Sequence, residues 1–288
     1  MDKFDRLSIG TLFRAFWGRV VLTWGWTLLE TAMLALLPLL IGRSIDGLLA
    51  GDWLPFQQFL IVLAVLLAVA VSRRVYDTRA YGTMRVELGA SLANRSEREP
   101  VSKVNARLGM SRELVDFLEA DVPQLMTALV QIVVSVAILF SFHNYLAISA
   151  TAAAISIMLV YMLFSRRFFR LNGELNEQTE NQVHVLESRS RDNISQHLSL
   201  LRRHEVRLSD TESVVYGFIF LILLSMLAFN LWFAAAKSGA TPGQIFSIVT
   251  YSYEFVQSAV VLPMALQSLT RLSEITNRIN QKGGGETI

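Results

Sequence analysis

The sequence predicts an all-α membrane protein with six transmembrane helices and two long cytoplasmic helical hairpins. The first observation is composition: 52% of the 288 residues are hydrophobic and only 17% are charged, whereas ordinary soluble domains carry roughly a quarter charged residues. The second is a set of six long apolar stretches, and the third is a bias of basic residues toward one side. The sequence contains no cysteine, which excludes disulfides, thiol catalysis and cysteine metal sites.

Each apolar stretch is long enough for a helix to cross the hydrocarbon of a bilayer, which takes roughly 20 residues. The stretches lack the period-two alternation of barrel strands, and helices and closed barrels are the structures that span lipid. We therefore expect a transmembrane domain over residues 20–266. Its spans are placed near residues 20–41, 56–72, 124–140, 145–164, 214–235 and 244–266.

The two ends of the chain are expected to lie outside the hydrocarbon. In residues 1–19, apolar side chains recur at helical spacing with basic residues between them, which suits an amphipathic elbow on the inner membrane surface. The alternative is a frayed basic tail. This segment is not interpreted as a removable signal, because no small-residue cleavage site follows an apolar core. Residues 267–288 are expected to form a cytoplasmic helix and tail.

Basic residues determine the expected orientation. The segments 1–19, 73–123, 165–213 and 267–288 hold 24 of the 26 lysines and arginines. The positive-inside rule therefore places both termini and both long connections in the cytoplasm. We expect an integral protein of the plasma membrane, the inner membrane of a bacterium.

The two cytoplasmic connections are long, whereas the outer connections are short. Both long connections have helical character, with an interruption in the first around Pro100 and Gly109. Arms of roughly 25 residues, at 1.5 Å per residue, would extend more than 30 Å into the cytoplasm. We interpret the arms as levers that meet a partner; the alternative is that they dock on the membrane surface.

This arrangement resembles the six-span transmembrane domain of an ATP-binding-cassette (ABC) exporter. "LLPLLIGRSIDGLLAGDW" resembles the end of the family's first span, and "SGATPGQIFSIVTYSYEFV" resembles the entry to its sixth. "RLGMSRELVDFLEADVPQLM" resembles the arm that returns to span three, with Asp121 as the acidic residue before the span. The resemblance extends from about Leu7 to Ile279 and implies alternating access by a dimer, formed with a second copy or a related chain.

The resemblance also implies where a partner ATPase would dock. On the first hairpin the expected contacts are Pro100, Val101, Lys103, Asn105 and Arg107; on the second they are Asp192 and Ser195. The sequence has no Gly-x-x-x-x-Gly-Lys-Ser/Thr motif, because none of its four lysines follows a glycine. We therefore expect the chain to be no enzyme, to hold no cofactor, and to use ATP only through an ATPase on a separate chain.

Two acids lie well inside predicted spans: Glu30 in the first and Glu254 in the sixth. A charge at the bilayer centre costs roughly 2.5–3.5 kcal/mol, so neither is expected to face lipid. Each lies on a polar stripe at helical spacing, as expected for faces that line a cavity. The stripes are Thr23, Thr27 and Thr31 in the first span, and Ser247, Tyr251 and Ser258 in the sixth.

Three roles remain open for these acids: proton coupling, contact with the cargo, and a structural hydrogen bond. Proton coupling would suit a gradient-driven transporter on the same fold, as in bacterial peptide-uptake transporters that keep an exporter-like fold. A non-transporting assembly or regulatory membrane protein is a further alternative. The sequence does not identify the cargo or its direction.

Other residue types carry weaker signals. The four histidines show no metal-ligand spacing, and we expect them to be solvated and to bind no metal. Pro38 and Pro263 could kink the first and sixth spans. Acids nearly balance the basic residues of the two arms, so no nucleic-acid partner is expected. The histidines are His143, His184, His197 and His204.

Overall fold

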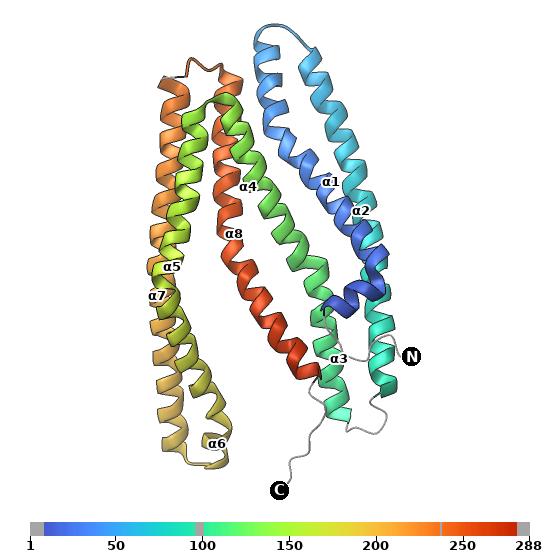
Figure 1. The fold of residues 1–288 in the computed structure, drawn as a ribbon, viewed down its shortest axis with the longest axis vertical. Coiled ribbons are helices and arrows are strands. Elements are labelled where there is room, and N and C mark those ends of the chain that lie inside the picture. Colours follow the sequence, from blue (N-terminus) through green and yellow to red (C-terminus); the bar gives the residue numbers. More distant parts are fainter. Residues whose placement is uncertain (1–8, 96–100, 237, 281–288) are drawn as a thin grey trace. The chain divides into compact units, whose positions relative to one another are not determined.

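The computed structural model describes residues 9–95, 101–236 and 238–280, which are helical apart from short turns (Figure 1). The elements in chain order are α1 (Ile9–Leu49), α2 (Leu54–Arg95), α3 (Val101–Asp116), the π-helix η1 (Phe117–Asp121), α4 (Val122–Phe142), α5 (Asn144–Glu180), α6 (Gln182–Glu187), α7 (Arg191–Ala236) and α8 (Pro242–Asn280). They form two compact units: α1 to α4 with α8 make the first, and α5 to α7 make the second.

Helices α1 and α2 form an antiparallel hairpin in the first unit, joined by a turn in which Gly51 has a φ of 79° (Figure 1). As residue numbers fall along α1, the numbers of the partners on α2 rise steadily, which is the register of two antiparallel helices. The paired residues are Ser44 with Pro55, Glu30 with Arg73, Thr23 with Tyr81, and Arg19 with Glu87.

The other face of α1 packs on α4 and α8. The pairing with α4 is parallel, because Trp24 donates to the Leu118 carbonyl just before α4 and the Thr31 hydroxyl bonds Thr127 further along it. The pairing with α8 is antiparallel. There the Ser247 and Tyr251 hydroxyls donate to carbonyls of α1, at Pro38 (2.9 Å) and Ala35 (2.7 Å) respectively. Helix α1 is therefore the shared neighbour of α2, α4 and α8.

The start of α1 departs from the helix axis at Phe16, whose φ of −121° and ψ of 17° are not helical. Figure 1 shows this first segment turned away from the rest of α1. Phe16 and Val20 are buried in an apolar core with the later half of α2, α3 and η1. The elbow predicted for residues 1–19 remains a prediction, because residues 1–8 lie outside the described part. The break in helical φ/ψ lies at Phe16 rather than at Pro38, which is buried within α1.

In the second unit, α5 and α7 pack antiparallel and α6 precedes α7. Their polar pairs are Ser149 with Asn230, Glu174 with His204, and Gln178 with His197. The expectation of four solvated histidines was wrong for His197, which is only 4% exposed. Its ring lies in the α5–α7 interface, where Nδ1 is 2.8 Å from the Gln178 amide nitrogen.

Five helical segments are long and apolar enough to cross a membrane. They lie in α1, in α2, in the end of α3 with η1 and α4, in α5 and in α7. Helix α8 has 39 residues, and the part of it that the structure describes is less apolar than these five. The interruption predicted at Gly109 was wrong, since α3 continues through this residue. The described helices therefore define an integral membrane protein, and α8 as a sixth span remains a prediction.

Gly42 of α1 and Gly243 of α8 face each other where these two helices meet. We expect this contact to tolerate no added methyl group. A Cβ on Gly42 would overlap the Gly243 carbonyl oxygen, whereas a Cβ on Gly25 of the same helix would meet nothing within 4 Å. Gly42→Ala should lower the free energy of unfolding by about 2 kcal/mol through overpacking. Gly25→Ala should leave it unchanged or raise it by up to about 1 kcal/mol. Thermal unfolding in detergent, followed by tryptophan fluorescence, measures both; equal effects would contradict the packing.

Candidate functional site

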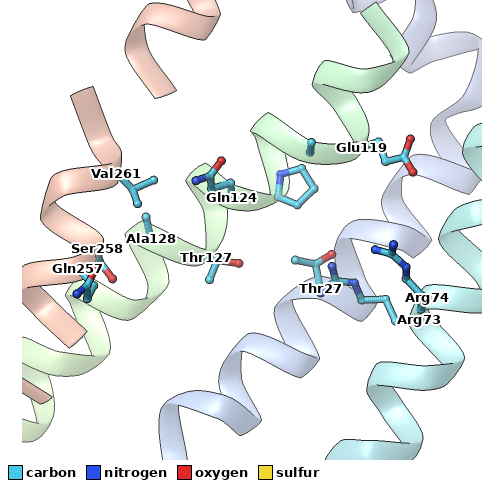
Figure 2. Close-up of a pocket in the computed structure, with 12 residues that line it drawn as sticks. Thr27, Arg73, Arg74, Glu119, Gln124, Thr127, Ala128, Gln257, Ser258 and Val261 are labelled. Atoms are coloured by element: carbon cyan, nitrogen blue, oxygen red, sulfur yellow. The ribbon is translucent and has the colours of Figure 1, made fainter. Parts of the chain in front are cut away.

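A cavity of about 550 Å³ opens within the first unit, between α1, α2, η1, α4 and α8. Figure 2 shows Thr27 from α1, two arginines from α2, and polar side chains of α4 and α8 around it. Its lining residues are Thr27, Arg73, Arg74, Glu119, Ala120, Pro123, Gln124, Thr127, Ala128, Gln257, Ser258 and Val261. Most of these side chains are polar or charged, and all but those of α8 come from segments that are apolar enough to cross a membrane.

The α2 side of the cavity carries a three-membered ion cluster. Arg73 donates through Nη1 to Oε2 of Glu30 at 2.8 Å and through Nε to Oδ2 of Asp77 at 3.1 Å. The three side chains are between 15% and 29% exposed, so water screens them only in part. One guanidinium bridging two carboxylates fixes α1 against α2, and its removal would leave both acids without their direct ion-pair partner at a half-buried site.

A second ion cluster closes the η1 end of the cavity. Arg85 donates to Asp116 Oδ1, with its Nε at 3.1 Å, and also donates to Glu119. The pairing holds Glu119 of the π-helix η1 against α2. By contrast, Arg74 is exposed and forms no ion pair with any residue that the structure describes. Among the described residues, Arg74 therefore has no carboxylate in direct contact, although Asp77 is near enough to interact with it electrostatically.

The α4 and α8 walls are neutral and polar. Thr127 shares a hydrogen bond with Thr31, and Gln257 donates to the Tyr253 hydroxyl at 2.7 Å. Gln124 is exposed toward the opening, and Ser258 is buried. A wall of amides and hydroxyls can donate and accept hydrogen bonds without carrying charge, so it suits a polar or weakly charged ligand.

The structure separates the predicted pathway residues of α1. Thr27 lines the cavity, and its hydroxyl donates to the Thr23 carbonyl at 3.0 Å. Glu30 lies next to the cavity and is held by Arg73. A role for either residue in binding cargo stays a prediction.

The predicted pathway residues of α8 form hydrogen bonds with the neighbouring helices α1 and α4. Ser247 and Tyr251 are almost fully buried, and their hydroxyls join α8 to α1 rather than lining the cavity. Glu254 accepts a hydrogen bond from the Gln131 side-chain amide of α4. Glu30 and Glu254 thus have different partners, one an arginine and the other a neutral amide.

The predicted ATPase contacts fall near helix ends. Pro100 lies outside the described residues, as do the side chains of Val101, Lys103 and Arg107, although these three positions belong to α3. Asn105 on α3 is exposed, and so are Asp192 and Ser195 in the first turns of α7. All three are accessible to a partner, and their coupling role stays a prediction.

Sequence reasoning missed Arg73, although a signal was present. The predicted second span ended at residue 72, which assigned Arg73 to the cytoplasmic connection. Counting outward from the turn near Gly51 in antiparallel register pairs Arg73 with Glu30. Gln124, Thr127 and Gln131 gave no comparable signal, because single amides and hydroxyls are common in membrane helices.

The long apolar helices define an integral membrane protein, and the cavity between them is lined mostly by polar and charged side chains. The family model described as ABC transporter transmembrane region matches residues 9–243. The chain belongs to this family. A search among curated proteins finds no match.

The Glu30–Arg73 ion pair gives a test of the site's geometry. Arg73→Gln and Glu30→Gln should each lower the free energy of unfolding by about 1–2 kcal/mol, less than for a fully buried pair because both side chains are partly hydrated. The double variant should cost less than the two single changes together, with a coupling of about 1 kcal/mol. Arg74→Gln, at the adjacent unpaired arginine, is the control and should change little. Additive costs, measured by thermal unfolding in detergent, would contradict the pairing.

Proposed function

We propose that the chain is the membrane-spanning permease subunit of an ABC-exporter-type transporter, works by alternating access, and takes its energy from an ATPase on a separate chain. The observation that carries the proposal is the polar cavity among α1, α2, α4 and α8, in a chain of the ABC transmembrane family. Charged side chains around a cavity among membrane helices are costly, and such groups commonly mark a substrate or ion pathway.

The proposed topology has six spans, with α8 as the sixth and both termini in the cytoplasm of a bacterium. The lysine and arginine bias supports this orientation. The helical extensions of α2 with α3, and of α5 with α6 and α7, then form the two cytoplasmic hairpins. Six spans are few for a central pathway, so we include a second copy or a related chain in the working transporter.

In this proposal the ATPase pushes on the two hairpin ends and the helices carry the movement into the membrane. Asn105, Asp192 and Ser195 are exposed at these ends and are available as contacts. Arg73 couples α2 to α1 through Glu30, so that displacement of the first hairpin would move both walls of the cavity. Hydrogen bonds between membrane helices average about 0.6 kcal/mol each, which is small enough for partners to exchange during a transport cycle.

A gradient-driven transporter is the second candidate, and Glu254 favours it. Its partner is the neutral Gln131 amide, so protonation of Glu254 would leave no cation without its counter-ion. Protonation of Glu30 would remove a counter-ion from Arg73. If a proton couples to transport, Glu254 is therefore the better carrier of the two.

Reconstitution in liposomes distinguishes these functions. We expect uptake of an uncharged, polar fluorescent probe, which the amide and hydroxyl walls of the cavity suit, to require ATP together with an ATPase subunit that co-purifies with the chain. Uptake driven by an imposed pH gradient without ATP, lost in Glu254→Gln and kept in the exposed-carboxylate control Glu205→Gln, would establish the second candidate. If neither condition drives flux and no ATPase co-purifies, a non-transporting assembly or regulatory role replaces both.

A further inference from the structure

A second, smaller cavity lies between α5 and α7 in the second unit and plays no part in the proposed pathway. Its volume is about 290 Å³, compared with roughly 30 Å³ for one water molecule. The lining residues are Arg167, Arg170, Leu171, Glu174, Arg207 and Asp210. Leu171 is buried beneath the charged side chains, so the cavity has an apolar base and a charged rim.

The position of this cavity along the two helices is at the membrane boundary. On α5, Arg167 follows the apolar stretch 145–164 by three residues, and on α7, Arg207 precedes the stretch 214–235 by seven. At 1.5 Å per residue these offsets are roughly 5 and 10 Å, compared with a headgroup layer of roughly 5–8 Å on each side of the hydrocarbon. Arg167 lies within this layer, and the long side chain of Arg207 can extend to it. Exposed apolar side chains continue into the hydrocarbon on both helices; they are Met162, Leu163, Val214 and Phe218.

The charges of the cavity are only partly satisfied within the protein. Glu174 is approached by Arg170 at 3.8 Å and by the His204 ring at 3.5 Å. Arg167, Arg207 and Asp210 line the same space and form no ion pair with any residue that the structure describes. The cavity therefore offers two guanidinium groups for an anion and, beside them, one carboxylate for a cation.

We propose that this cavity binds the headgroup of a phosphoethanolamine lipid from the cytoplasmic leaflet. Arg167 and Arg207 hold the phosphate, because guanidinium groups match phosphate oxygens with paired donors. Asp210 accepts hydrogen bonds from the primary ammonium, and the acyl chains lie along the exposed apolar surface of α5 and α7. The site is independent of the transport proposal and depends only on the membrane depth of these two helices.

The carboxylate of Asp210 should give the site a preference among phospholipid headgroups. A phosphatidylglycerol headgroup satisfies the arginines but brings no cation to Asp210. A phosphatidylcholine headgroup carries a quaternary ammonium, which has no N–H to donate. The site should therefore prefer phosphatidylethanolamine to both.

Native mass spectrometry of the purified full chain, titrated with each of the three lipids at matched acyl chains, tests the site. Wild type should retain phosphatidylethanolamine in preference to the other two. Arg207→Gln and, independently, Arg167→Gln should weaken that binding about fivefold, the contribution of roughly one basic residue at a membrane surface. Asp210→Asn should abolish the preference over phosphatidylglycerol while keeping phosphate binding. The matched controls are Arg191→Gln and Glu205→Gln, exposed residues of α7 that do not line the cavity.

Three results would overturn the proposal. The first is equal or stronger retention of phosphatidylglycerol by wild type, because it would leave Asp210 without a role. The second is unchanged binding in both arginine variants. The third is competition by soluble glycerophosphoethanolamine at concentrations equal to the lipid. The acyl chains would then contribute nothing, and the site would bind soluble phosphoesters rather than a membrane lipid.

Discussion

The packing of α1 against three neighbours through polar groups is the constraint on which the first unit depends. Lipid tails are as apolar as leucine, so burial of apolar side chains gives membrane helices little reason to associate. Membrane helices associate instead through hydrogen bonds, ion pairs and the close approach of small residues. Helix α1 uses all three: Glu30 pairs with Arg73 on α2, Thr31 bonds Thr127 on α4, and Gly42 allows contact with α8.

The same polar groups form the boundary of the cavity. Arg73 contributes both to the α1–α2 contact and to the cavity wall, and Thr127 contributes both to the α1–α4 contact and to the opposite wall. A pathway between helices that are held by a few polar contacts can change shape when those contacts exchange partners. In the proposed transporter, the same few side chains would therefore stabilise the helix packing and line the pathway. A change in the shape of the cavity would then change the packing of α1.

The sequence predicted the helical class from features that need no tertiary structure: apolar length, charge bias and connection length. It predicted the family from its resemblance to the transmembrane domain of ABC exporters. It did not predict how α1 meets its neighbours, because that depends on register and rotation. Glu30 was recognised as costly in lipid, yet its partner Arg73 was not found, because the pairing depends on the register of α1 against α2. His197 was judged by ligand spacing alone, whereas burial between α5 and α7 determines its contacts. The polar residues Ser247, Tyr251 and Glu254 of α8 were assigned to a cavity face, whereas their hydrogen bonds join α8 to α1 and α4.

Disulfide formation between α1 and α4 tests the central packing most directly, and the cysteine-free sequence makes the experiment clean. The Thr31 and Thr127 hydroxyl oxygens are 3.0 Å apart, and a disulfide needs Cβ atoms about 4 Å apart. After mild oxidation in membranes, Thr31→Cys with Thr127→Cys should give an intramolecular bond between the two peptides, found by mass spectrometry. Leu34→Cys with Thr127→Cys, in which the α1 position is exposed, should not. Failure of the first pair to cross-link, or bonds formed only between chains, would contradict the account.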